Sequence, residues 1–288
     1  FNGALILNYE IIILKIVLVF LAMLIFLVSE TYFKNTKLGY FEYNILFLSS
    51  LLGCLLTLSA NDLMIFYISL EIQALAFYIM ATMKKSATSS EAGLKYFVIG
   101  SFSSALLLFG ISLIVLLTGH HNFNNIQCFF EFSLISNLSL SIIIPKTLPV
   151  LGLLPFGISE LLTFGVILII TALLIKLAVA PFHEWVADIY EGIPTPTALL
   201  FATLPKISNF FILVRLTQSI FVKFSEILQP FLILACILSL ILGCLNAFKQ
   251  QNIKRFLAFS SVNHFGFILL GLVVGTKEGI AASFFYLS

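Results

Sequence analysis

The stretch of sequence that decides the fold is LMIFYISLEIQALAFYIMA, residues 63–81, an apolar run with a single charge, Glu71. A bilayer core about 30 Å thick needs about 20 apolar residues for one spanning helix. Glu71 lies nine residues after Asp62 and thirteen before Lys84. At about 1.5 Å of rise per residue, these separations are about 13.5 Å and about 20 Å. The run therefore predicts a transmembrane helix with a carboxylate near its midpoint.

The composition of the whole chain agrees with a membrane protein. Of its 288 residues, 60% are hydrophobic and 10% charged, with 15 Lys and Arg against 13 Asp and Glu. Soluble domains are about 45–50% apolar and about 25% charged. The figures argue against a soluble enzyme, and against a disordered chain, which needs low hydrophobicity and high charge. Basic residues occur only in scattered pairs, so nucleic-acid binding has no support. The sequence indicates an all-α polytopic membrane protein.

Outward from residues 63–81, we expect eight spanning segments, each long and apolar enough to cross a bilayer. The connection 119–159 contains three prolines, and its apolar stretch 138–158 is expected to form a re-entrant or surface helix rather than a span. The expected spans are residues 11–29, 42–60, 63–83, 93–118, 160–182, 197–216, 229–248 and 254–274.

Lysines gather in the connections 30–41, 84–92 and 249–254, which fall on one side of the predicted bundle. The positive-inside rule places that side in the cytoplasm or matrix. The acidic loop 183–196 is expected on the same side, and acidic residues count little in the rule.

A second charge at membrane depth is Lys206. It lies nine residues from both Thr197 and Arg215, which is about 13.5 Å each way. A charge at a helix centre costs at least about 2.5–3.5 kcal/mol. Pro205 removes a backbone donor next to it and is expected to loosen the helix, leaving carbonyl groups free for water or a proton carrier.

Three further ionisable residues lie in or near predicted spans. Lys176 comes seven residues before His183, about 10.5 Å inside the span. His264 follows Lys254 by ten residues, about 15 Å, and is expected at the bilayer centre. Lys95 follows a polar run by a few residues and is expected near the interface.

Charges in membranes usually mark an ion or proton pathway, yet each of these residues also has a structural interpretation. Glu71 and Lys206 could form a purely structural buried ion pair. Lys176 could snorkel to the interface, and this is the favoured interpretation for Lys95. His264 could be a hydrogen-bonded structural histidine.

The same burial suggests a chemistry. Loss of water favours the neutral form of a lysine, whereas a nearby carboxylate favours the charged form. Movement of Glu71 toward or away from Lys176 would therefore switch that lysine between holding and releasing a proton. Lys206 and His264 would pass the proton onward through bound water. Such a pump element needs no cofactor of its own.

Motifs for nucleotide and metal chemistry are absent from the sequence. It has no GxGxxG after a strand and no Walker A motif, and His183-Glu184 begins no HExxH. The four cysteines show no CxxC spacing and no neighbouring His, so no zinc or iron–sulfur site is predicted. We expect no cofactor and no metal in this chain.

Residues 176–208, KLAVAPFHEWVADIYEGIPTPTALLFATLPKIS, resemble the signature of the proton-pumping, antiporter-like membrane subunits of respiratory complex I. Related branches of that family share the PFH-W and PTP elements. The form D-x-Y-x-G-x-P-T-P from Asp188, followed by Pro-Lys at Lys206, resembles the subunit 2 branch of NADH:ubiquinone oxidoreductase in particular. Supporting stretches are LEIQALAFYIMA (70–81), EAGLKYFVIGSFSSALLLFGISL (91–113) and QQNIKRFLAFSSVNHFGF (250–267).

The resemblance implies a fold of antiporter-like inverted five-helix repeats, each with a broken helix, a device found widely among transporters. Residues 1–41 would hold an extra N-terminal transmembrane helix, and residues 42–219 the first repeat. Residues 220–288 would begin the second repeat, which is incomplete in this chain, being either truncated or completed by another polypeptide.

The resemblance also implies which residues translocate protons. Glu71 matches the family's essential glutamate, Lys176 its broken-helix lysine, and Lys206 the lysine of the next helix. Lys95 matches a lysine at the start of the preceding helix, and His264 a histidine of the connecting axis. The family's last lysine, on the second broken helix, has no counterpart in the sequence.

These matches imply a proton-translocating membrane-arm subunit of NADH:ubiquinone oxidoreductase, with no redox centre in this chain. FMN, iron–sulfur clusters and ubiquinone are expected in partner subunits. The expected partners are other membrane-arm subunits, neighbouring antiporter-like subunits among them, together with lipids and no nucleic acid. A second chain that supplies the missing C-terminal helices is one further possibility.

The implied location is the mitochondrial inner membrane, which the 31 phenylalanines favour, with a bacterial plasma membrane as the alternative. Two other functions stay open at this point. One is a subunit of a multi-subunit cation/proton antiporter, and the other is a non-pumping scaffold of the membrane arm. The D-x-Y-x-G pattern argues against the first, and the charges at membrane depth argue against the second.

Overall fold

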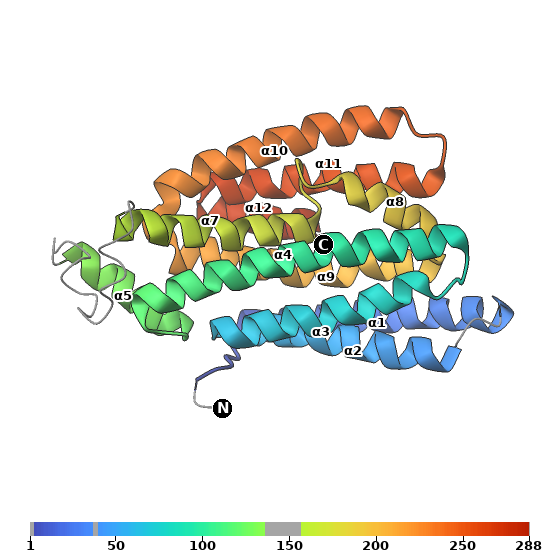
Figure 1. The fold of residues 1–288 in the computed structure, drawn as a ribbon, viewed down its shortest axis with the longest axis horizontal. Helices are drawn as coiled ribbons and strands as arrows, with labels where there is room; N and C mark the ends of the chain where they lie inside the picture. The colour runs from blue at the N-terminus through green and yellow to red at the C-terminus, as the bar shows by residue number, and fades with distance from the viewer. Residues whose placement is uncertain (1–2, 37–39, 136–156, 288) are drawn as a thin grey trace.

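The computed structural model describes residues 3–36, 40–135 and 157–287, and over these ranges the chain is almost wholly helical (Figure 1). A π-helical turn, η2 (Leu216–Ile220), and a 3-10 turn, η3 (Val222–Phe224), separate two of the long helices. The α-helices are α1 (Tyr9–Thr36), α2 (Tyr40–Ser59), α3 (Leu63–Thr82), α4 (Ala87–Thr118), α5 (Phe123–Ile135), α7 (Ile158–Leu177), α8 (Glu184–Gly192), α9 (Thr195–Arg215), α10 (Ser225–Phe248), α11 (Ile253–Val274) and α12 (Lys277–Leu287).

Helix ends are set by short polar side chains and glycines. The Asp62 carboxylate accepts a hydrogen bond from the Met64 amide at the start of α3, and Asn252 accepts one from Lys254 at the start of α11. Gly119 and Gly275, with φ of 72° and 69°, follow α4 and α11 in the left-handed conformation that closes a helix. Local sequence therefore accounts for where these helices begin and end.

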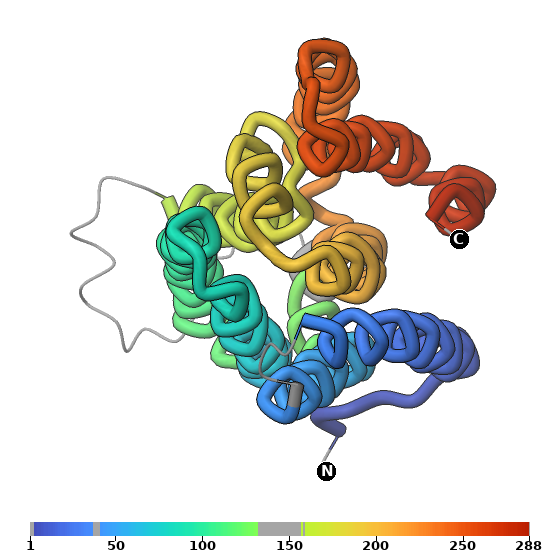
Figure 2. Tube along the Cα trace, turned by 90° about the vertical axis from the view of Figure 1, so that its right-hand side faces the viewer, coloured from blue at the N-terminus to red at the C-terminus, as the bar shows by residue number. Residues whose placement is uncertain are grey.

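The long helices lie side by side along one direction (Figure 1). Viewed along that direction, α9 lies in the middle, with α1 to α3 on one side of it and α10 and α11 on the other (Figure 2). Buried residues make up 72% of the most apolar window of α9, against 22% for α1. The helix that carries Lys206 is thus the central one, which accounts for the burial of that lysine.

The eight expected spans are confirmed, since eight helices in the described ranges are long and apolar enough to cross a membrane. Several boundaries differ from expectation. Helix α1 continues to Thr36 rather than ending at 29. Helix α4 begins at Ala87 rather than at 93, because Ser86 caps it. Helix α7 ends at Leu177 rather than at 182. The expected re-entrant helix at 138–158 falls almost wholly on residues outside the described ranges, and it stays a prediction.

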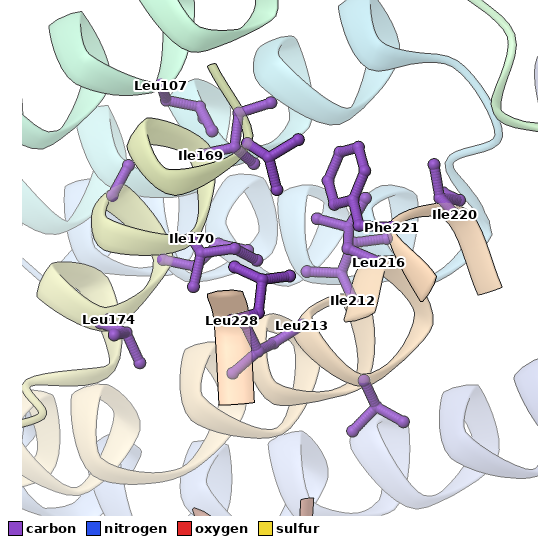
Figure 3. Close-up of a cluster of buried hydrophobic side chains, with 14 of the residues drawn as sticks. Leu107, Ile169, Ile170, Leu174, Ile212, Leu213, Leu216, Ile220, Phe221 and Leu228 are labelled. Carbon is purple, nitrogen blue, oxygen red and sulfur yellow. The ribbon is translucent and has the colours of Figure 1, made fainter. Parts of the chain in front are cut away.

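Packing at the core of the bundle is apolar and dense. Side chains of α4, α7, α9, η2 and α10 converge there, as shown by Leu107, Ile170, Leu213, Leu216 and Leu228 (Figure 3). Between lipid-surrounded helices such contacts stabilise mainly through van der Waals packing, because lipid tails are as apolar as leucine. Close packing therefore fixes the rotation of each helix.

Two glycines bring α4 and α7 close together. A Cβ atom on Gly110 would lie 2.8 Å from the carbonyl oxygen of Gly165 and 2.9 Å from the Ile169 side chain. Small residues at such a crossing are the usual means by which membrane helices approach each other closely. The contact sets the distance between the polar side chains that α4 and α7 carry.

A polar cluster closes one end of the bundle. The two terminal nitrogens of Arg215 donate 2.6 Å hydrogen bonds to the Ala60 carbonyl and to Asn61 Oδ1. Asn61 in turn donates to the Gly3 carbonyl, and the guanidinium lies over the Phe123 ring. These bonds join the N-terminal segment, the α2–α3 turn, α5 and α9.

The segment that the sequence led us to expect as an acidic loop, 183–196, is mostly helix α8. Together α7 and α8 make one broken helix, interrupted between Leu177 and Glu184. The interruption begins at Ala178, whose φ of 60° is left-handed and ends α7. A broken helix carrying Lys176 was the expectation, and the structure confirms it. The boundaries at 41/42 and 219/220 stay predictions.

Candidate functional site

Glu71 and Lys176 form an ion pair between α3 and the end of α7. Lys176 Nζ lies 3.9 Å from Glu71 Oε1, and the lysine and glutamate side chains are 11% and 25% exposed. Lys176 sits in the last turn of α7, where the carbonyl groups at a helix C-terminus favour a positive charge. The helix break thus holds a lysine deep in the bundle next to a carboxylate.

Ser104 on α4 joins the two members of this pair. Its hydroxyl donates a short hydrogen bond to Glu71 Oε1, and Lys176 Nζ lies 3.5 Å from the same hydroxyl oxygen. The sequence reasoning missed this residue. The available signal was a group of serines, at 101, 103 and 104, inside an apolar span.

Lys206 is buried on α9, with 5% of its surface exposed. Its Nζ donates a 2.9 Å hydrogen bond to Ser261 Oγ on α11 and lies 4.9 Å from the centre of the Phe265 ring. A ring face attracts a cation, so both contacts suit an ammonium group. The structural ion pair between Glu71 and Lys206 is therefore wrong, because the partner of Glu71 is Lys176. Helix α9 continues through Pro205, so the expected loosening does not interrupt it.

A small enclosed cavity of about 40 Å³ is lined by both Lys176 and Lys206. A cavity needs about 10–15 Å³ of such space for one water molecule, and a bound water needs polar partners. Five polar side-chain atoms around this cavity are buried without a hydrogen-bond partner among the described residues: Gln73 Oε1, Tyr78 OH, Ser103 Oγ, Trp185 Nε1 and Asn209 Oδ1. The cavity therefore has both the room and the partners for water between the two lysines.

On its other side Lys206 lines a larger, more open pocket of about 470 Å³, together with Ser261, His264 and Tyr286. His264 Nδ1 lies 2.9 Å from the Tyr286 hydroxyl. His264 is exposed on α11 and faces this pocket, and its expected depth at the bilayer centre stays a prediction. Depth along a helix can be counted in the sequence, but the side toward which a residue points cannot. Lys206 thus borders two cavities, one shared with Lys176 and one with His264.

Lys95 belongs to a different cluster. Its Nζ lies 2.8 Å from Glu91 and 2.7 Å from Asp188, and the side chain is 42% exposed. The expected interfacial position of Lys95 stays a prediction. Arg255 contacts Asp188 on its other side and Glu191 at 2.6 Å. The hydrogen bond from Lys95 lowers the pKa of Asp188, which lies on the short helix α8.

This cluster, Lys95–Asp188–Arg255 with Glu91 and Glu191, ties α4, α8 and α11 together at one end of the bundle. Sequence reasoning used Asp188 only as part of a motif and passed over Arg255. Charges of opposite sign on three predicted elements were the available signal. The structure therefore divides the five candidate residues into a mostly buried series, Glu71, Lys176 and Lys206, with the exposed His264 at its end, and Lys95 outside it.

Metal ligands do not gather in the described ranges, where no group of three or more His, Cys, Asp or Glu side chains could hold an ion. The chemistry that the buried series supports is acid–base exchange between a carboxylate, two lysines and a histidine, with hydroxyl groups and water between them.

Comparisons with known proteins show a family match and similar sequences. Residues 60–288 match the family described as NADH:quinone oxidoreductase/Mrp antiporter, TM. The chain is 40% identical over 262 residues to NADH-quinone oxidoreductase subunit N of Pelagibacter ubique, covering 91% of this chain and 50% of that protein. It is 37% identical over 268 residues to subunit N of Rhodospirillum rubrum, covering 93% of this chain and 50% of that protein. The chain spans about half the length of the curated relatives it matches.

Solved structures show a similar fold. A chain of respiratory complex I from Thermus thermophilus with bound aureothin superposes with a TM-score of 0.71 at 29% identity, covering 95% of this chain and 54% of that one. A chain of the Mrp complex from Dietzia sp. superposes with a TM-score of 0.77 at 23% identity, covering 95% of this chain and 47% of that one. The second likeness is one of fold alone.

Proposed function

The chain belongs to the NADH:quinone oxidoreductase/Mrp antiporter membrane family, and from that premise we propose that it translocates protons as a subunit of a respiratory NADH:quinone oxidoreductase. The redox chemistry that drives the protons takes place in other subunits. FMN, iron–sulfur clusters and quinone are held there, and this chain supplies acid–base side chains.

The observation that carries the proposal is the position of Lys206 between two cavities. It borders the enclosed space shared with Lys176 and the open pocket shared with His264. A proton held near Glu71 and Lys176 therefore has a water-sized space before Lys206, and the pocket of His264 and Tyr286 after it. The order along the route is carboxylate, lysine, water, lysine and histidine.

The contacts of the two lysines support a directed transfer. Lys176 lies beside a carboxylate, which holds its proton. The polar partner of Lys206, among the described residues, is a hydroxyl rather than a carboxylate. Movement of Glu71 away from Lys176 makes the charged form of Lys176 less favourable, and the proton moves toward Lys206. Return of Glu71 resets the pair.

Within the family, we propose that the chain is the counterpart of the bacterial subunit N, which corresponds to the subunit 2 branch. The identity of 37–40% to several subunit N proteins supports this. Its partners are then other membrane-arm subunits, including neighbouring antiporter-like ones, and the surrounding lipids. For the location we propose the mitochondrial inner membrane, which the phenylalanine-rich composition supports. The bacterial relatives support a plasma membrane as the alternative.

A cation/proton antiporter is the second candidate, favoured by the family description, which names Mrp antiporters beside NADH:quinone oxidoreductases. Purification of the complex in mild detergent separates the two functions. Subunits carrying flavin and iron–sulfur clusters in the same particle support the oxidoreductase, and their absence removes it.

Proton translocation itself is tested in membrane vesicles that carry the assembled complex. Lys206→Ala is expected to lower the number of protons moved per NADH oxidised while the complex still assembles. Lys249→Ala, which removes an exposed lysine at the end of α10, is the matched control. An unchanged proton yield in the Lys206 variant would favour the non-pumping scaffold.

A further inference from the structure

The hydroxyl of Ser104 has two acceptors within reach and one hydrogen to give. Glu71 Oε1 on α3 is one acceptor, and the carbonyl oxygen of Gly100, one turn back on α4 at 3.1 Å, is the other. A serine hydroxyl carries a single donor hydrogen and two acceptor lone pairs. It therefore donates to only one of the two at any moment.

The hydroxyl oxygen also faces Lys176, whose Nζ lies 3.5 Å away. When the hydrogen points to the carboxylate, a lone pair is free to face the ammonium group. The carboxylate and the ammonium are themselves 3.9 Å apart, beyond hydrogen-bond distance. Ser104 is thus the group through which the two charges are hydrogen-bonded.

The hydroxyl of Ser104 donates a hydrogen bond in either orientation, to Glu71 or to the Gly100 carbonyl. A serine within a helix commonly donates to the carbonyl four residues earlier, which here is Gly100. The loss of Glu71 as an acceptor therefore does not leave a buried donor unpaired, a defect that would be costly in a membrane. The helix supplies the second acceptor in advance.

The packing holds this serine in place. Only 5% of Ser104 is exposed. Gly100 lies against α3, since a Cβ there would be 2.1 Å from the Tyr78 hydroxyl, and Gly110 holds α4 against α7. The serine therefore stays between α3 and α7 while its hydroxyl rotates.

We propose that Ser104 is a positioning residue that switches with Glu71. While the carboxylate is charged and near, the hydroxyl donates to it and holds it beside Lys176. When the carboxylate is neutral or withdrawn, the hydroxyl turns to Gly100. The hydroxyl keeps its own hydrogen throughout, so the step gains and loses no proton. The inference rests on the proposed function and adds the element that sets the two states of the Glu71–Lys176 pair.

The test measures the rate of proton transfer through this subunit in vesicles carrying the assembled complex during NADH oxidation. Ser104→Ala removes the hydroxyl, and the rate of proton transfer is expected to fall about tenfold, the size expected for one lost charge-assisted hydrogen bond. Ser104→Thr keeps a hydroxyl and is expected to recover most of the rate. Ser101→Ala is the control, because Ser101 is exposed on the same helix and its hydroxyl bonds only to the Val98 carbonyl.

Full proton transfer in Ser104→Ala, with Glu71→Gln impaired, overturns the switch and leaves the proposed function standing. Full proton transfer in both Ser104→Ala and Glu71→Gln overturns the switch and the proposed function together. A Thr variant that assembles but is as impaired as Ala also overturns the switch, because the hydroxyl is then not the group that matters. If the Ala variant fails to assemble, Ser104→Cys, a weaker donor of similar size, replaces it with the same expected loss.

Discussion

Glu71 and Lys176 come from different helices and lie 3.9 Å apart, close enough for an ion pair and too far for a direct hydrogen bond. The separation matters because a carboxylate and an ammonium in direct contact would hold each other in one state. Where a hydroxyl lies between the two charges, the hydroxyl can exchange one hydrogen-bond acceptor for another, so the charges can separate at little cost in free energy. The loose geometry of this pair is therefore consistent with a switch rather than with a structural salt bridge.

Glu71→Gln keeps the size and hydrogen-bonding shape of the side chain and removes its charge. We expect this variant to lose proton transfer about a hundredfold or more, nearly as much as Glu71→Ala, since an acid–base group commonly contributes at least about a hundredfold. Proton yield per NADH in vesicles is the measurement. Coupling equal to wild type in the Gln variant would remove the charge-switch mechanism.

Ser261→Ala removes the hydroxyl that accepts from Lys206 Nζ. The ammonium then keeps the Phe265 ring but loses its polar partner, so its charged form becomes harder to hold. We expect a fall of about tenfold in proton transfer, since a hydrogen bond to a charged group is worth about 1.5–3 kcal/mol. The same vesicle assay checks this, with Ser112→Ala, an exposed serine of α4, as control. An unaltered rate would show that Ser261 plays no part in holding the proton on Lys206.

Asp188→Asn weakens the cluster that ties α4 to α11 through α8. The carboxylate is 34% exposed, so the loss is expected to be modest, about 1 kcal/mol. For a chain of this size that corresponds to a fall of about 2–4 °C in thermal midpoint. Heating the purified complex and following residual activity measures it. A midpoint equal to wild type would mean that the cluster adds nothing to the joint between these helices.

The stabilisation by Asp188 is also expected to depend on pH. Its folded-state pKa is lowered from 3.8, chiefly by the Lys95 hydrogen bond. The contribution is therefore fully present above the unfolded pKa, near 3.8, and is lost as the pH falls through the lower folded value. The difference in thermal midpoint between wild type and Asp188→Asn should be constant near neutral pH and shrink only below pH 3.8. A difference that vanished near neutral pH would contradict this assignment.

Gly110→Val places a side chain where α4 meets the Gly165 carbonyl, with 2.8 Å available to its Cβ. We expect destabilisation of about 1–3 kcal/mol, the usual effect of overpacking. Because α4 must move away from α7, Ser104 also separates from Lys176, and proton yield should fall. Ala105→Val, on the exposed face of the same helix, is the control. If the Gly110 variant kept wild-type stability and proton yield, α4 and α7 would not be in close contact at Gly110.

The sequence by itself determined the membrane fold and the buried charges. A bilayer of fixed thickness demands apolar runs of a certain length, so the spans can be counted from residues alone, and a charge such as Glu71 or Lys206 stands out within one. Depth follows from the rise of a helix. A broken helix carrying Lys176 was expected from the resemblance of residues 176–208, and the structure confirmed it, with the break after Leu177 rather than at 182.

Only the tertiary structure decided which charges face each other. The rotation and crossing of helices depend on close contacts such as Gly110 with Gly165, which no periodicity in one helix reveals. That is why Ser104 and Ser261 were missed, and why the pocket that His264 faces could not be deduced from its position along the helix. Distance along a helix is a local property of the chain, whereas the partner of a side chain is set by how neighbouring helices pack.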